Sequence, residues 1–153
     1  MKRLFVYLFL TAILATSGFA QSSGQKRQFN LDKSGLAIEG YDPVSYFDSG
    51  RAMEGRKEFA VVSEGITYWF STPEHRELFK ANPAKYQPQY GGWCAYAMGD
   101  SGEKISVDPE TFKVLNGKLY LFYNKFFNNT LKDWNKAESA LKTKADQNWS
   151  KIN

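Results

Sequence analysis

The sequence predicts an α+β fold, in which an antiparallel sheet of two hairpins is covered by a short helix and a long C-terminal amphipathic helix. Two stretches, residues 58–71 and 112–123, are rich in β-branched and aromatic side chains, and each has a glycine-containing dipeptide near its centre. A third stretch, residues 125–152, repeats apolar residues at steps of three, four and seven. This spacing places the apolar side chains on one face of a helix.

The prediction of two hairpins depends on their turn residues. Glu64-Gly65 and Asn116-Gly117 each stand between apolar runs, and two-residue hairpin turns favour residues that accept a positive φ. The last strand, residues 118–123, has Leu119, Leu121 and Tyr123 on one face and Tyr120 and Phe122 on the other. Because both faces are apolar, we expect this strand to lie in the middle of its sheet.

Proline marks the start of two short helices. Asp42-Pro43 begins the first, which Gly50 can end in a left-handed conformation. Thr72-Pro73-Glu74 begins the second, with a capping hydroxyl, a proline in the first turn and an acid near the positive end of the helix. The second helix ends before Pro83, which disfavours a helical residue in front of it.

The predicted C-terminal helix has a clear apolar face. Its members are Phe127, Leu131, Trp134, Leu141, Ala145 and Trp149. We expect this face to pack on the sheet. A helix lying on a membrane surface is the alternative, which the acidic residues on the polar face disfavour.

The first twenty residues have the features of a secretory signal peptide. Lys2 and Arg3 precede an apolar run over residues 4–14, and Gly18-Phe19-Ala20 supplies a small-x-small cleavage site. The run is shorter than the roughly 20 residues that a membrane-spanning helix needs. We therefore expect cleavage before Gln21, a periplasmic or secreted protein, and no membrane span in the mature chain.

The remaining chain reads as one domain behind a flexible lead-in. Residues 21–28 are polar and rich in Gly and Ser, and residues 29–153 form the predicted domain. Loss of Lys2 and Arg3 lowers the formal charge from +4 to +2, because residues 1–20 contain no acid. The other lysines are scattered among acids, so we expect no nucleic-acid partner.

Cys94 is the only cysteine in the chain and lies in the segment Gly91-Gly92-Trp93-Cys94-Ala95-Tyr96. An exported protein usually pairs its cysteines, so this thiol is buried, bound to a ligand, or bonded to another molecule. The glycines allow the backbone to approach a ligand, and Trp93 and Tyr96 can line an aromatic pocket. A tight bend and ordinary core packing are the simpler explanations of the same residues.

Several segments together resemble the YHS domain, a small αβ module related to zinc-binding domains of metal-handling proteins. The similar segments are Tyr68-Trp69-Phe70-Ser71 and residues 82–86, together with residues 40–47, 90–97, 108–109 and 117–121, which match its exported, longer relatives. The resemblance extends over roughly residues 36–149. It implies that the metal-binding members place cysteines at the positions of Ser45, Ser71 and His75.

Serine hydroxyls are poor ligands for zinc or copper, so we do not expect the metal site that the resemblance implies. A different site is open: Cys94 with His75, the only histidine, and a sulfur such as Met98 would suit Cu(I), whereas zinc would need further ligands. The same two residues could act as a thiol nucleophile and its base.

The sequence thus favours an exported binding module, with a metal ion (copper or zinc) or a small molecule held near Cys94. The residues predicted to bind the ligand are Cys94, Gly91, Gly92, Trp93 and Tyr96, and those predicted to bind a metal are Cys94 and His75. Two alternatives remain: a structural or interaction protein with an inert Cys94, and a thiol-dependent enzyme that uses Cys94 and His75. No residue is assigned a catalytic role, and the sequence does not indicate an oligomeric state.

Overall fold

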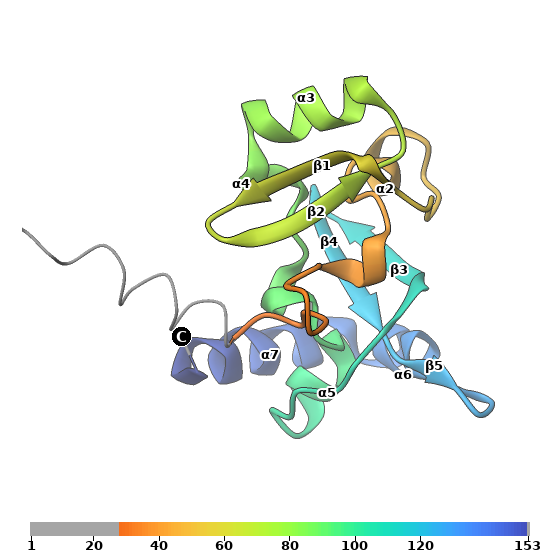
Figure 1. Cartoon of the computed structure of the whole chain (residues 1–153). Helices are drawn as coiled ribbons and strands as arrows, with labels where there is room; N and C mark the ends of the chain where they lie inside the picture. The colour runs from red at the N-terminus through yellow and green to blue at the C-terminus, as the bar shows by residue number, and fades with distance from the viewer. Residues whose placement is uncertain (1–27, 153) are drawn as a thin grey trace, which may run out of the picture.

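The computed structural model describes residues 28–152 and confirms the α+β class. The predicted signal peptide and all but the last residue of the predicted lead-in lie outside the described residues. The fold has two parts that follow one another along the chain (Figure 1). The first contains the β1–β2 hairpin with helices α2, α3 and α4, and the second contains the β3–β4 hairpin with helices α5, α6 and α7.

The first part agrees closely with the sequence prediction. Strands β1 (Arg56–Ser63) and β2 (Ile66–Phe70) pair antiparallel, and their turn residues Glu64 and Gly65 have φ of 51° and 79°. Helix α3 (Pro73–Ala81) begins at Thr72, whose side chain accepts a hydrogen bond from the His75 amide. The remaining helices of this part are η1 (Ile38–Gly40), α2 (Ser45–Asp48) and α4 (Pro83–Tyr86).

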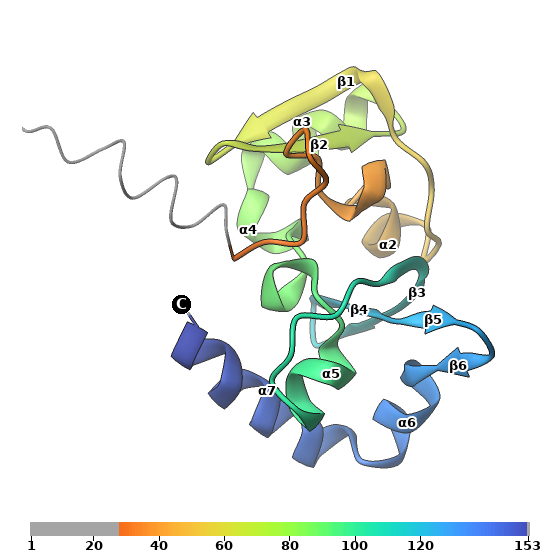
Figure 2. The same ribbon diagram turned by 60° about the horizontal axis from the view of Figure 1, so that its bottom comes forward.

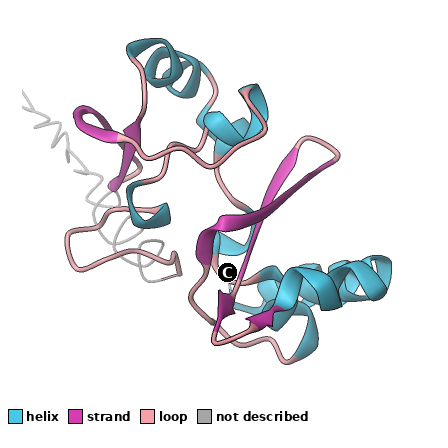
Figure 3. Ribbon diagram, turned by 90° about the vertical axis from the view of Figure 1, so that its right-hand side faces the viewer, coloured by secondary structure: helices cyan, strands magenta, loops and turns pink. Residues whose placement is uncertain are grey.

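The two long hairpins form separate two-stranded sheets, so the prediction of a single sheet is wrong (Figure 3). The second sheet consists of β3 (Asp108–Leu115) and β4 (Lys118–Phe122). A short segment bridges to one strand of each hairpin. Leu36 bridges to Thr67 of β2, and Pro88 bridges to Leu119 of β4. An occupied edge has no free backbone groups to offer another strand at that point.

Strand β4 is buried on both faces although it has only one long partner strand. Leu119 and Leu121 belong to the core of the first part, which also contains Phe70 and Phe79. Tyr120 and Phe122 belong to a second core around Trp134. The two apolar faces therefore reflect two cores on opposite sides of β4, and the predicted central position in a larger sheet is wrong.

The predicted helix over residues 125–152 is wrong in its first third. A third hairpin, β5 (Asn124–Lys125) and β6 (Asn128–Asn129), precedes α6 (Thr130–Lys136) and α7 (Glu138–Ile152). The side chain of Asn129 accepts a hydrogen bond from the Leu131 amide and thereby caps α6. Phe127, which we expected on the apolar helix face, lies instead in the hairpin turn with φ of 64°.

Helix α7 packs mainly along α5 (Ala95–Asp100) and contributes Leu141 and Ala145 to the second core (Figure 2). The two helices approach closely at Gly99, where an added Cβ atom would lie 2.4 Å from the Leu141 carbonyl oxygen. Among residues 28–152, no helix combines the length and the apolar character that crossing a bilayer requires.

Candidate functional site

The segment from Gly91 to Tyr96 does not line a single site. The turn η2 (Gln89–Gly92) reverses the chain with positive φ at Tyr90, Gly91 and Gly92, and Cys94 then precedes α5. Trp93 and Gly92 fasten the start of the domain: the Trp93 indole donates to the Gln28 carbonyl at 2.6 Å, and the Gly92 carbonyl accepts from the Asn30 amide group at 3.1 Å. Gly91 lines one hollow, whereas Cys94 and Tyr96 line another.

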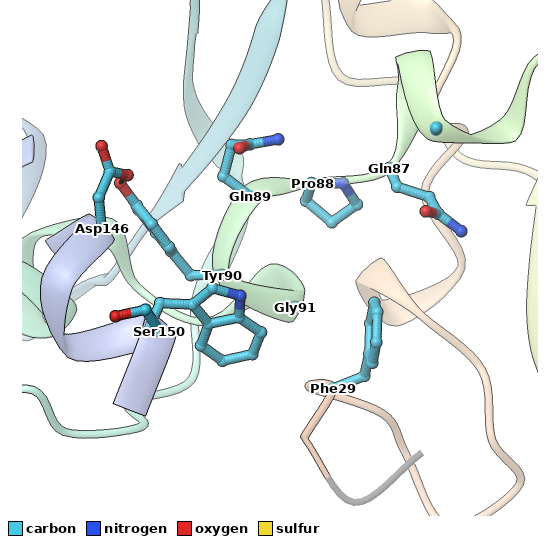
Figure 4. A pocket seen from close by; sticks show the side chains of 10 residues that line it. Phe29, Gln87, Pro88, Gln89, Tyr90, Gly91, Asp146 and Ser150 are labelled. Atoms are coloured by element: carbon cyan, nitrogen blue, oxygen red, sulfur yellow. Dashed lines mark hydrogen bonds between the residues drawn. The ribbon is translucent and has the colours of Figure 1, made fainter. Parts of the chain in front are cut away.

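The first of these, the Tyr90 hollow, has a volume of about 550 Å³ (Figure 4). Its lining residues are Phe29, Ala84, Gln87, Pro88, Gln89, Tyr90, Gly91, Asp146, Trp149 and Ser150. The Tyr90 hydroxyl donates to Asp146 at 2.8 Å, and Lys142 donates to the other oxygen at 2.6 Å. Burial alone would raise the pKa of Asp146, but the hydrogen bonds from Lys142 and Tyr90 outweigh it and lower the pKa. Among the described residues that line this hollow, Asp146 is the only acid, and it is already paired.

The second, the Cys94 hollow, has a volume of about 390 Å³. Its lining residues are Cys94, Tyr96, Ala97, Asp100, Ser101, Glu103, Ile105, Tyr123, Asn128 and Thr130. The Cys94 sulfur lies 3.4 Å from the Tyr123 amide nitrogen, which donates to it, and 3.5 Å from the Thr130 hydroxyl oxygen. Although Cys94 forms part of the wall, its exposed fraction is 0%. Bulk solvent therefore does not reach the thiol in this conformation.

His75 lies in the first part of the fold and belongs to a network around Asp42. The Asp42 carboxylate is completely buried. One of its oxygens accepts from the Val44 amide at 2.9 Å. The other accepts from the Ser71 amide at 2.8 Å, from the Ser71 hydroxyl at 2.5 Å and from His75 Nδ1 at 2.6 Å. A buried charge needs several such donors, and here they come from the start of α2, the end of β2 and the first turn of α3.

The three positions at which the YHS resemblance implies cysteines come together in this network. The Ser45 hydroxyl donates to the Asp42 carbonyl at 2.8 Å, and Ser71 and His75 both contact the Asp42 carboxylate. We predicted that Asp42 caps a helix, which is wrong: α2 begins at Ser45, its N-cap residue is Val44, and no side chain caps it. The Asp42 carboxylate instead accepts from the Val44 amide in the turn before the helix. Its contacts with Ser71 and His75 were missed. The sequence did hold one indication of this network, because the YHS resemblance assigns Ser45, Ser71 and His75 to one common site.

The Asp42, His75 and Ser71 side chains do not form a nucleophile relay. In such a relay, the acid and the hydroxyl contact opposite nitrogens of the imidazole. Here Ser71 donates to Asp42 and lies 3.4 Å from the same nitrogen, Nδ1. The other nitrogen, Nε2, lies 3.5 Å from the Asp48 carboxylate. The geometry indicates a structural role for His75.

Cys94 and His75 share no hydrogen-bond or ion-pair partner among the described residues. Cys94 contacts Tyr123 and Thr130, whereas His75 contacts Asp42, Asp48, Ser71 and Thr72. Met98, the proposed third metal ligand, lies in the second core with Trp134. Within residues 28–152, no group of three or more His, Cys, Asp and Glu side chains could hold a metal ion. The arrangement therefore favours neither a copper nor a zinc centre.

Comparison of the chain with protein-family models, with curated proteins and with solved structures returns no match. The resemblance to the YHS domain thus remains a prediction from the sequence motifs.

The Asp42 network predicts a large difference between two aspartates that contact opposite sides of the His75 ring. Asp42→Ala removes a buried acceptor of four hydrogen bonds, and we expect a loss of about 3–5 kcal/mol in unfolding free energy. Asp48→Ala removes a carboxylate whose side chain is 63% exposed, and we expect a change within about 0.5 kcal/mol. Urea unfolding measures both. Equal losses for the two variants would contradict the structural role of Asp42.

The burial of Cys94 predicts slow modification of its thiol. Because the exposed fraction of Cys94 is 0%, modification requires local opening. We expect N-ethylmaleimide to react with the native protein at least about a hundredfold more slowly than with the urea-unfolded protein. Mass spectrometry follows the reaction without background, since the chain has no other cysteine. Similar rates in the two states would show that the thiol is open to solvent.

Proposed function

We propose that this protein is an exported binding module of the bacterial envelope that holds a small neutral or cationic molecule in the Cys94 hollow. Export is inferred from residues 1–20, which have the charge, apolar run and cleavage site of a signal peptide. One observation carries the binding site: Cys94 lines a hollow together with Tyr123 and Thr130, whose amide and hydroxyl groups contact its sulfur.

The size and lining of the Cys94 hollow suit a small organic ligand. Its volume of about 390 Å³ falls within the range of small-molecule sites, roughly 300–1,000 Å³. Tyr96, Ala97 and Ile105 offer apolar surface, and Asn128 and Thr130 offer polar groups that can orient a ligand. Such a combination of apolar walls with a few polar groups is typical of binding sites.

The charges in the wall favour a particular class of ligand. Asp100 and Glu103 line the hollow, and none of the described residues that line it is basic. A wall with acids alone attracts a cation and repels an anion. The ligand is therefore a neutral or positively charged molecule, such as an amine.

The contacts of Cys94 favour binding of a small molecule over metal binding or catalysis. Cys94 is the only Cys or His among the lining residues, and copper or zinc needs further sulfur or nitrogen ligands. A thiol-dependent enzyme would need a base near the sulfur. His75, the only histidine, contacts Asp42 instead.

The complete burial of Cys94 supports a second candidate function, a structural or interaction protein of the envelope with an inert thiol. The two functions differ in what occupies the Cys94 hollow. In the second, the hollow is a surface depression with no ligand of its own, and filling it changes nothing.

A pair of probes tests the proposed site. Benzylamine and benzoate have similar size and opposite charge. We expect benzylamine to shift the amide NMR signals of Tyr96, Tyr123 and Asn128, and benzoate to leave them unchanged, because Asp100 and Glu103 line the hollow.

Matched Ala→Leu variants provide the control. Ala97→Leu fills part of the Cys94 hollow, and Ala81→Leu adds the same side chain to a separate surface hollow on α3. We expect only Ala97→Leu to abolish the benzylamine shifts. The proposal fails if benzoate binds as well as benzylamine, if neither probe binds, or if both variants behave like the wild type.

A further inference from the structure

The β5–β6 hairpin carries two phenylalanines at its tip. Lys125 pairs with Asn128, so Phe126 and Phe127 form the two-residue turn. Their exposed fractions are 90% and 110%, the highest among the exposed large apolar side chains of the described chain. The hairpin projects from the body of the protein in both Figure 1 and Figure 2. These two residues are named the Phe-Phe tip below.

The backbone of the Phe-Phe tip favours other residues. Phe126 and Phe127 have φ of 53° and 64°, nearly the same as Asn116 and Gly117 in the β3–β4 turn, with 51° and 71°. Asn-Gly adopts this conformation readily, whereas an aromatic residue at positive φ is strained. The tip thus combines a strained backbone with two rings that pack against nothing in the described chain. Neither the strain nor the exposed rings stabilise the isolated fold. This combination indicates that the rings contact something outside the chain.

The charges next to the tip identify the kind of surface that fits. Residues 124–136 contain three lysines and one acid, Asp133, which pairs with Lys136. Lys125 and Lys132 are exposed and form no ion pair within the described part of the chain. The acids Asp100 and Glu103 line the Cys94 hollow with Asn128, which follows the tip in β6. The tip itself is apolar, exposed lysines precede and follow it in the chain, and the two acids lie in the hollow that Asn128 lines.

We propose that the Phe-Phe tip inserts into the interfacial region of an anionic phospholipid bilayer and holds the protein at the membrane surface. Phenylalanine rings next to basic residues bury in this region, and lysines in the same segment attract anionic headgroups. The short strands of the hairpin limit insertion to shallow depth, where the polar side chains of Asn124 and Asn129 meet hydrated headgroups. A protein pocket would satisfy the rings equally well, but the flanking lysines favour the anionic surface.

The decisive variant is Phe126→Asn/Phe127→Gly, which gives this hairpin the turn residues of the β3–β4 hairpin. We expect its thermal midpoint to equal or exceed that of the wild type, because Asn-Gly relieves the strain. We expect its affinity for phosphatidylethanolamine–phosphatidylglycerol vesicles in co-sedimentation to fall at least about tenfold. All proteins compared start at Gln21, the residue after the predicted cleavage site, so the apolar run over residues 4–14 does not contribute to lipid binding.

Two further variants separate charge from ring insertion. Lys125→Gln/Lys132→Gln lowers binding to the anionic vesicles and leaves binding to pure phosphatidylcholine unchanged. Phe127→Trp retains binding, and brominated lipids then quench the added indole. The proposal is overturned if the wild type does not bind vesicles, or if Phe126→Asn/Phe127→Gly binds as tightly as the wild type. It is also overturned if sedimentation shows self-association that this variant abolishes, since the occupant is then a second copy.

Discussion

The buried carboxylate of Asp42 is the constraint on which the first part of the fold depends. With 0% exposure, the carboxylate has no access to bulk water and relies on donors within the protein. Its four hydrogen bonds join two segments that are distant in sequence: the start of α2, and the stretch from the end of β2 to the first turn of α3. Because the Asp42 hydrogen bonds hold the end of β2 next to the start of α3, they also hold Phe70 of β2 against Phe79 of α3 in the core.

This constraint also determines what His75 is available to do. Because Nδ1 is bound to Asp42 and Nε2 faces Asp48, the ring is held by carboxylates on both sides. Cys94, in contrast, contacts Tyr123, which directly follows β4, and Thr130 at the start of α6. It also packs in the core that contains Phe70 and Phe79. The two residues that the sequence suggested as partners thus have different polar contacts, His75 with Asp42 and Cys94 with Tyr123 and Thr130. The proposed binding site belongs to the second half, and the Asp42 network supports the first.

Features that depend on neighbouring residues could be predicted from the sequence, whereas contacts between distant residues could not. The two long hairpins were predictable because Glu64-Gly65 and Asn116-Gly117 are local turn signals, and α3 because Thr72-Pro73 is a local cap. The β5–β6 hairpin was missed because Phe126-Phe127 carries no turn signal and Phe127 continues the helical spacing of the next segment. The split into two sheets depends on edge contacts at Thr67 and Leu119 that no local pattern reveals.

The candidate site was predictable only in part, for a related reason. A lone cysteine beside two glycines directs attention to residues 91–96, and Cys94 and Tyr96 do line a common hollow. The other walls come from Glu103, Tyr123 and Asn128, which approach Cys94 only after folding. The Asp42–His75 contact joins residues 33 positions apart. Such contacts depend on tertiary structure, which spacing along the sequence does not encode.

The protonation of the His75 ring tests the central claim most directly. Long-range ¹H–¹⁵N correlation spectra distinguish a protonated ring nitrogen from an unprotonated one, and the single histidine makes the assignment unambiguous. Since Nδ1 lies 2.6 Å from the buried Asp42 carboxylate, our account predicts that Nδ1 carries a proton at neutral pH, whether or not Nε2 is also protonated. An unprotonated Nδ1 in the native protein would contradict the account.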